Sequence, residues 1–267
     1  MNKFTLPTIL VLLRKIPFHR KLGILERLFG KQLKKAGVVW AGTSAGPIWK
    51  LDLQNHTHRW IVYGDYEGPG FIRWAKKWVR KDSIVVDSGA NIGQVLLYLA
   101  PKIKTGTWIA VEPHPMARKW LKECLQEQDG WRVRVEPFGL GEHLDRCSMS
   151  EDWGGDILGS HTHLQTGTGD IPVMTLDYYA RKNFITKIRL WKLDMEGGEE
   201  AALRGAEELF RQRAIEALVM ETDEKRFPEA VAFMQARGFS CYSWDGTPMM
   251  KVPRKFFGNV LFLLSRK

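Results

Sequence analysis

Two acidic residues follow two apolar segments at positions where a bound nucleoside would need them. Asp87 ends the run Ser83-Ile-Val-Val-Asp87, and Glu112 ends the run Trp108-Ile-Ala-Val-Glu112. The first acid opens a turn that contains two glycines, Asp87-Ser-Gly-Ala-Asn-Ile-Gly93. A carboxylate at the end of the second strand suits a ribose, whose two hydroxyls can both donate hydrogen bonds to it. The spacing therefore predicts a nucleoside-binding site.

The turn differs from a dinucleotide-binding turn in a way that predicts the charge of the ligand. The third glycine of the fingerprint Gly-x-Gly-x-x-Gly is missing. Asp87 would repel a pyrophosphate but attract an ammonium group. S-adenosylmethionine, with a sulfonium, an ammonium and a carboxylate, is a ligand of net positive charge. We expect it to bind here, although packing alone can also produce such a turn. The expected contacts are Asp87, Gly89, Ala90, Asn91, Gly93, Glu112 and Pro113.

Alternating strands and helices must position these residues. Continuous apolar runs predict buried parallel strands, and the last two strands form a pair. Residues 142–170 are poor in core signals and predict short strands and a mobile loop. The alternation predicts a mostly parallel sheet with a reversed edge strand. The expected strands are 83–87, 108–112, 131–138, 188–194, 217–221, 239–244 and 259–264, and the expected helices are 93–100, 115–128, 199–211 and 227–237.

The positive charge is concentrated at the amino terminus. The chain has 267 residues and a net charge of +10. Residues 1–35 hold nine Lys or Arg and one acid, a net charge of +8, and the remaining 31 bases and 29 acids give +2. A nearly neutral body lacks the broad basic surface that RNA prefers, so no specific nucleic-acid partner is expected.

Three regions are expected along the chain: a basic helical arm at 1–37, a small β and helical lead-in at 38–75, and the main domain at 76–267. Apolar residues in the arm predict an amphipathic helix at Ile16, Leu22, Leu25, Leu28 and Phe29. The arm could pack on its own domain or a second subunit, lie on a membrane surface, or contact RNA. In the lead-in, 48–53 and 59–63 alternate and predict strands, followed by a helix at 71–80.

The cysteines and the amino-terminal apolar run indicate the compartment. Three widely spaced cysteines form neither a zinc motif nor a disulfide framework, so we expect no metal and a reducing cytoplasm. The run at 4–13 is too short to span a bilayer and lacks a convincing cleavage site. We expect a cytoplasmic protein, with membrane association through the arm as the alternative.

At this point the chain resembles the FkbM-type methyltransferases, which are Rossmann-like and use S-adenosylmethionine. The resemblance covers about residue 50 to the end and implies seven strands with the last antiparallel. It also implies methylation of a small molecule, most often at a hydroxyl on a sugar or natural product. Its motifs are Gly64-Asp-Tyr-Glu67, Asp87-Ser-Gly-Ala-Asn-Ile-Gly93, Val111-Glu-Pro113, Pro172-Val-Met-Thr-Leu-Asp177, Lys192-Leu-Asp-Met-Glu-Gly197 and Leu203-Arg-Gly-Ala206.

The chain departs from the family pattern after its third strand. Gly139 stands where many members carry Asn, so the backbone near Phe138 is expected to contact the adenine instead. Glu67 is expected to close over the cofactor, with a plain surface acid as the alternative.

Transfer of a methyl group to a hydroxyl requires alignment of the reactants and removal of the hydroxyl proton. Asp194 and Glu196 end a strand where open α/β sheets bind ligands. We expect Asp194 to contact the methionine end of the cofactor and Glu196 to act as base or orienter, unless Glu196 only caps the following helix. His161 and His163 are further candidate bases.

Two further side chains are candidates for contact with the acceptor. Glu221 ends a strand and could reach the acceptor or form a buried ion pair. Trp153 could stack on a sugar.

These residues leave three functions open. The first is O-methylation of a hydroxyl on a small molecule. The second is N-methylation of an amide or amine on a peptide or natural product, which needs a stronger base arrangement for an amide. The third is a non-catalytic protein that docks on membrane or RNA, which gives no reason for two acids at the cofactor turn.

Overall fold

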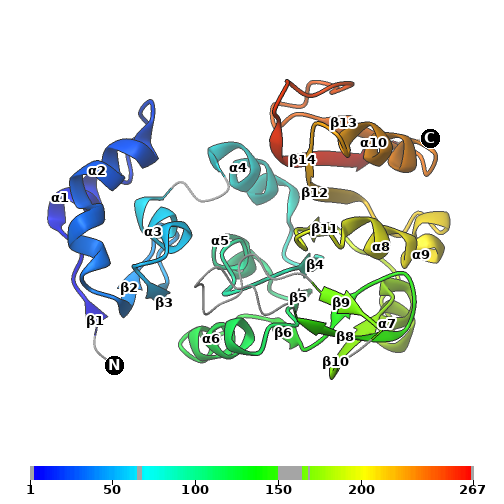
Figure 1. Cartoon of the computed structure of the whole chain (residues 1–267), viewed down its shortest axis with the longest axis horizontal. Coiled ribbons are helices and arrows are strands. Elements are labelled where there is room, and N and C mark those ends of the chain that lie inside the picture. Colours follow the sequence, from blue (N-terminus) through cyan, green and yellow to red (C-terminus); the bar gives the residue numbers. More distant parts are fainter. Residues whose placement is uncertain (1–2, 65–67, 150–163, 168, 266–267) are drawn as a thin grey trace.

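The computed structural model describes residues 3–64, 68–149, 164–167 and 169–265, and its centre is a seven-stranded sheet (Figure 1). The strand order is β13-β14-β12-β11-β4-β5-β6, and β14 runs antiparallel to both of its neighbours. The other strands are parallel to one another, which confirms the predicted Rossmann-like class. The strands are β4 (Ile84–Ser88), β5 (Thr107–Val111), β6 (Val133–Glu136), β11 (Leu190–Leu193), β12 (Ala217–Asp223), β13 (Phe239–Tyr242) and β14 (Phe257–Leu264).

Helices cover both faces of this sheet because adjacent strand residues point to opposite sides. Val85 and Val219 belong to one apolar core, and Val86 and Leu218 belong to the other. The first core contains α4 (Gly68–Trp78), α5 (Leu96–Leu99) and α6 (Pro115–Gln126). The second contains α7 (Leu176–Lys182), α8 (Glu199–Arg204), α9 (Glu207–Arg211) and α10 (Phe227–Gln235).

Two predicted helices differ in extent from the structure. The helix after the glycine turn continues past Leu99 as a 3₁₀ helix, η1 (Ala100–Lys102), because proline is tolerated in the first turn of a helix. The helix predicted at 199–211 is divided into α8 and α9 at Gly205. A Cβ on Gly205 would lie 2.1 Å from the carbonyl oxygen of Gly141, so the close approach of these two backbones requires glycine there.

The amino-terminal region forms a second, three-stranded sheet. The order is β1 (Lys3–Phe4), β2 (Val38–Gly42) and β3 (Ile48–Asp52), with β1 parallel and β3 antiparallel to β2. The strand predicted at 59–63 is wrong, because these residues belong to the helix α3 (His56–Tyr63). The Asn55 side chain accepts the amide of Thr57 and caps the helix, and Gly64 ends it in a left-handed conformation.

The helices α1 (Thr8–Leu13) and α2 (Lys21–Lys34) of the arm pack on this region, and α2 confirms a helix in the predicted place, although Leu28 of the predicted apolar face is exposed and Ile16 precedes the helix. Leu10, Leu25 and Leu33 are fully buried in the core that also contains α4 and α5. The Glu26 carboxylate accepts two hydrogen bonds from the buried Arg59 guanidinium, at 2.8 and 2.9 Å. No helix among the described residues has the length and apolar character needed to cross a membrane.

A four-stranded sheet follows β6 and occupies part of the region predicted as short strands and loop. Its order is β7-β10-β8-β9, made of β7 (Gly139–Leu140), β8 (Asp145–Met149), β9 (Leu164–Thr166) and β10 (Ile171–Met174). Residues 150–163 are outside the described part of the chain, and so are the candidates Trp153, His161 and His163. Glu67 is also outside it.

Candidate active site

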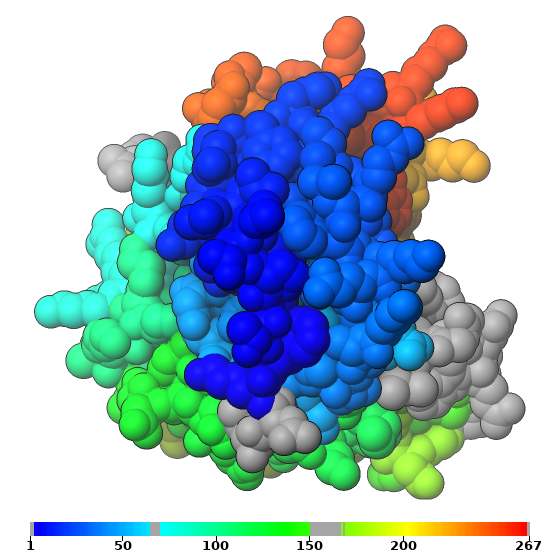
Figure 2. All heavy atoms as spheres, turned by 90° about the vertical axis from the view of Figure 1, so that its left-hand side faces the viewer, coloured from blue at the N-terminus to red at the C-terminus, as the bar shows by residue number. Residues whose placement is uncertain are grey.

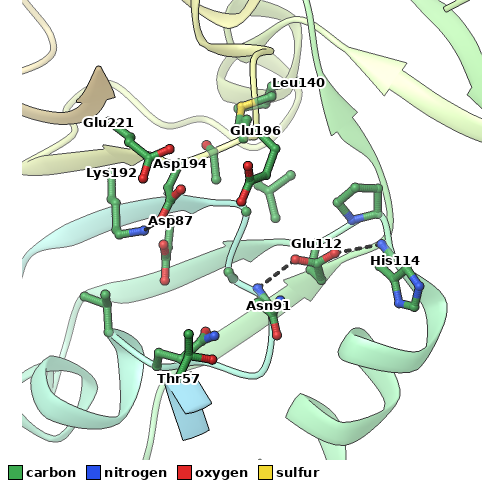
Figure 3. A pocket seen from close by; sticks show the side chains of 18 of the residues that line it. Thr57, Asp87, Asn91, Glu112, His114, Leu140, Lys192, Asp194, Glu196 and Glu221 are labelled. Atoms are coloured by element: carbon green, nitrogen blue, oxygen red, sulfur yellow. Dashed lines mark hydrogen bonds and ion pairs between the residues drawn. The ribbon is translucent and has the colours of Figure 1, made fainter. Parts of the chain in front are cut away.

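A pocket of about 400 Å³ opens at the carboxyl ends of β4, β5, β11 and β12 (Figure 3). The sheet reverses its order of connection between β4 and β11, which is where open α/β sheets bind ligands. Five carboxylates line the pocket, and Lys192 is the one Lys or Arg among its described lining residues. The acids are Asp87, Glu112, Asp194, Glu196 and Glu221.

The glycine turn after β4 is pressed against the end of β11. Gly89 has a φ of +76°, and a Cβ there would lie 1.8 Å from the carbonyl oxygen of Asp194. Its amide donates to Val111 at 3.0 Å and so connects the turn to β5. Only glycine combines this conformation with this approach, so the turn brings the ends of three strands together.

Glu112 is fixed by the backbone around it. Its carboxylate accepts the amide of Asn91 at 2.7 Å and the amide of His114 at 2.7 Å, one at each oxygen (Figure 3). Burial raises the pKa of Glu112 to about 7, and these two amide bonds lower it by a smaller amount. Each oxygen keeps a further lone pair, so the carboxylate can accept two hydroxyl donors from a ribose without changing its position.

Asp87 is almost completely buried but lacks a hydrogen-bond partner of good geometry. Its side chain is 1% exposed, and neither oxygen is satisfied. Burial raises the pKa of Asp87 to about 6, Lys192 and the nearby Trp108 indole lower it, and Asp194 raises it further. A buried carboxylate without partners costs free energy, and a cationic donor that enters the pocket would recover that cost.

The remaining acids gather around Lys192. The Lys192 ammonium lies 2.6 Å from the Asp194 carboxylate, and Glu221 and Glu196 point toward the same space (Figure 3). Burial raises the pKa of Glu221 to about 8, with further contributions from Asp194 and Glu196. One buried cation cannot balance this group of acids, so the pocket favours a cationic ligand and disfavours a diphosphate.

A family model described as "Methyltransferase FkbM domain" matches residues 87–241, more than half of the chain. The chain belongs to the FkbM methyltransferase family. Within the matched range lie the glycine turn, both cofactor-site acids and the segment of Lys192 and Glu196. The resemblance suggested by the motifs is therefore confirmed.

The individual proteins and solved structures that the chain resembles are distant relatives. The chain is 23% identical to Methyltransferase 1 of Beauveria bassiana over 183 residues, which are 60% of this chain and 73% of that protein. Among solved structures, it is similar to a precorrin-6y C5,15-methyltransferase from Geobacter metallireducens (11% identity, TM-score 0.41, 73% of this chain and 88% of that chain). It is also similar to an rRNA methylase from Streptococcus thermophilus (15% identity, TM-score 0.44, 73% of this chain and 95% of that chain). None of these likenesses bears on the substrate.

The residues of this pocket fit S-adenosylmethionine, the methyl donor of FkbM methyltransferases. The unsatisfied Asp87 carboxylate suits a charged donor group, and the fixed Glu112 carboxylate suits a ribose. The excess of acids over Lys192 suits the net positive charge of the donor. No group of three or more His, Cys, Asp or Glu in the described ranges is arranged to hold a metal ion.

Glu196 is held by a short loop between β11 and α8. Its φ is +53°, a left-handed conformation that is uncommon for residues other than glycine. The buried Glu199 carboxylate accepts the amides of Met195 at 2.8 Å and Gly197 at 3.3 Å, one on each side of Glu196. Glu199 therefore holds the loop on both sides of Glu196, which lines the pocket, and among the described residues no side chain caps α8 at Gly198.

Most of the described residues expected in the site are brought together by the fold, with two outside the lining. Gly93 lies in the turn and would bring a Cβ within 2.8 Å of Leu121, so its role is in packing. Phe138 is buried against Tyr179, with ring centroids 5.2 Å apart. The expected residues that line the pocket are Asp87, Gly89, Ala90, Asn91, Glu112, Pro113, Gly139, Asp194 and Glu196.

The contribution of the amino-terminal region to the lining of the pocket was not predicted from the sequence. His56, Thr57 and Trp60 of α3 line the pocket. Trp60 fell in the strand predicted at 59–63, and no element was predicted for His56 and Thr57, so the i, i+1 and i+4 spacing that places them on one side of a helix was missed. Lys192 was quoted only as part of a motif, although a lysine in an otherwise apolar strand indicates a buried ion pair.

Proposed function

We propose that the protein methylates a hydroxyl oxygen of a small molecule, such as a sugar or another natural product. The observation that supports the proposal is a pair of acids, Glu196 and Glu221, that line the pocket together with the acids that suit the cofactor. A hydroxyl needs its proton removed as the new bond forms, and a carboxylate in hydrogen-bond reach can take it.

In this proposal Glu196 holds the acceptor hydroxyl and receives its proton. S-adenosylmethionine supplies the activated methyl group when it is bound. Asp87 and Glu112 fix the position of the cofactor, so the displacement needs only an aligned nucleophile. The Glu199 carboxylate holds the loop that carries Glu196. Glu221, whose pKa is raised to about 8, lies beside Glu196 as a proton-bearing neighbour at neutral pH.

The amide N-methylation alternative makes a different demand on the site. An amide nitrogen is a poor nucleophile until it is deprotonated, which requires a base much stronger than a carboxylate. The described lining offers carboxylates, His56 and His114, and Lys192, which is paired with Asp194. These groups support hydroxyl chemistry better than amide chemistry.

The test is incubation with labelled S-adenosylmethionine and a small-molecule extract, followed by mass analysis of the labelled products. We expect products with a methyl group on oxygen. Products labelled on nitrogen, or label found only on RNA, would contradict the proposal.

Single-turnover rates then test the base. Glu196→Gln should lower the rate by about 10²-fold or more with unchanged cofactor affinity, because general-base catalysis contributes this much. Glu200→Gln, an exposed acid on α8, is the matched control and should leave the rate unchanged. An unchanged rate in Glu196→Gln would exclude the role as base.

A further inference from the structure

The outer face of the arm combines exposed aliphatic side chains with positive charge. Leu12 and Leu28 are 59% and 61% exposed, although large aliphatic residues are usually buried. Figure 2 shows that the amino-terminal segment covers much of one side of the molecule, and the helices α1 and α2 lie side by side there in both views. The exposed aliphatic residues of this arm face are Ile9, Leu12, Ile16, Ile24 and Leu28.

The spacing of these residues places them on one side of each helix. In α2, Ile24 and Leu28 are four residues apart on the outer side, whereas Leu33 is buried on the opposite side and Leu25 is buried between the two sides. In α1, Ile9 and Leu12 are three residues apart and exposed, whereas Leu10 is buried, and the exposed Ile16 follows the end of the helix. The arm is therefore apolar on two sides: one side packs on the protein, and the other is covered by nothing in the described part of the chain.

Basic residues surround the exposed aliphatic ones. In α2, Arg27 lies three residues after Ile24 and Lys31 three residues after Leu28, and both basic residues are exposed. The Glu26 carboxylate, the single acid of the arm, accepts hydrogen bonds from Arg59 and Tyr63 and also lies 3.4 Å from the Lys34 ammonium, so it offsets one of the exposed basic residues and leaves the others. The exposed basic residues are Lys3, Lys15, Arg20, Arg27, Lys31, Lys34 and Lys35.

We propose that the outer face of α1 and α2 docks the enzyme on an anionic lipid membrane surface. An amphipathic helix binds such a surface with its aliphatic residues in the headgroup region and its Lys and Arg residues near the lipid charges. The fold holds two such helices in place through Leu10, Leu25 and the Glu26–Arg59 pair, so docking needs no prior ordering of the arm.

Charge and residue type distinguish this partner from two others. A second copy of the chain would bring two faces of like charge together, which opposes association. RNA would satisfy the charge, but proteins that bind single strands stack bases on aromatic side chains. The exposed apolar residues of the arm face are aliphatic, and Phe18 and Phe29 are packed against the core instead.

Sedimentation of the whole protein with vesicles tests the proposal. We expect weak binding to phosphatidylcholine vesicles and strong binding when about a third of the lipid is phosphatidylserine. Each Lys or Arg near an anionic surface contributes about fivefold to the partition coefficient. The double variant Arg27→Glu, Lys31→Glu should therefore lower it at least about 25-fold. The control Lys81→Glu, Lys104→Glu reverses two exposed charges outside the arm and should have little effect.

A second pair of variants tests the aliphatic part. Ile24→Gln with Leu28→Gln keeps helix propensity and should lower vesicle binding about tenfold. Phe184→Gln removes an aromatic side chain that is 90% exposed and lies outside the arm, and this variant should bind as the unchanged protein does. Circular dichroism melting curves confirm that each variant folds.

Three outcomes of the binding assays would overturn the proposal. They are equal binding to neutral and anionic vesicles, equal effects of arm and control variants, and binding to an RNA homopolymer but not to vesicles. A stable dimer that Leu28→Gln dissolves would assign the face to a second copy and would also overturn it.

Discussion

The charge state of Glu112 should control the affinity for the cofactor. The two amide bonds at 2.7 Å hold this carboxylate where only its remaining lone pairs can receive ribose hydroxyls. A protonated carboxyl loses one of these acceptor positions. Because burial raises the pKa of Glu112 to about 7 in the ligand-free protein, a proton must leave before the cofactor binds well near neutral pH.

The magnitude follows from the linkage of one proton to binding. Above pH 8 the group is ionised and the affinity is constant. Below its pKa of about 7 the affinity falls tenfold per pH unit, which amounts to about 30-fold at pH 5.5. Asp87, with a pKa raised to about 6, adds a smaller loss with the same sign.

Calorimetric titration with S-adenosylmethionine from pH 5.5 to 8.5 measures this dependence. Glu112→Gln should weaken binding at pH 8 by about 10- to 100-fold, because an amide N–H would face a backbone N–H and one ribose acceptor is lost. It should also remove most of the pH dependence. Glu123→Gln, an acid on α6 outside the pocket lining, is the control. An affinity that is independent of pH in both Glu112→Gln and the unchanged protein would refute this reasoning.

Three further predictions concern stability. Gly89→Ala should lower the unfolding free energy by at least about 3 kcal/mol or prevent folding. The control Gly130→Ala, where φ is +70° and the space for a Cβ is open, should lower it by about 1 kcal/mol. Chemical denaturation measures both values. Glu26→Ala should cost about 2 kcal/mol because it leaves the buried Arg59 unpaired, against under about 0.5 kcal/mol for the exposed Glu200→Ala. The pocket acids with raised pKa values hold their protons more tightly in the folded than in the unfolded protein, so the stability that they contribute is complete below about pH 4.5 and is lost as the pH rises. The melting temperature of the ligand-free protein should therefore fall from pH 5 to 8, and bound cofactor should reduce that fall. A melting temperature that rises over this range would contradict the last prediction.

The sheet and the cofactor turn were predictable because their signals are local. Continuous apolar runs define β4 and β5, and Asp87 and Glu112 stand at the ends of these runs. The left-handed position of Gly89 follows from the sequence of the turn. These features depend on residues only a few positions apart, so their pattern can be recognised in the sequence.

The prediction of a strand at 59–63 failed because the structure there depends on a contact between residues far apart in the chain. Residues 59–63 alternate like a strand, but Arg59 is buried by its pair with Glu26, which lies 33 positions earlier in the chain. The contacts of Glu196 and Glu199 are close in the chain, but they depend on the conformation of the loop between β11 and α8. Only the path of the loop decides which carboxylate accepts the amides of that loop and which one lines the pocket.

The opposite charges of the arm and the pocket restrict the acceptor more than either does alone. A polyanion such as RNA would be attracted to the arm, whereas the Glu196 carboxylate would repel phosphates in the pocket. A neutral polyol or a cationic acceptor meets no such barrier, and a positive charge on the acceptor would lower the raised pKa of Glu221 on binding. The charge distribution therefore supports small uncharged or cationic acceptors, taken up by a protein whose positive side faces anionic lipid in the proposed docked state.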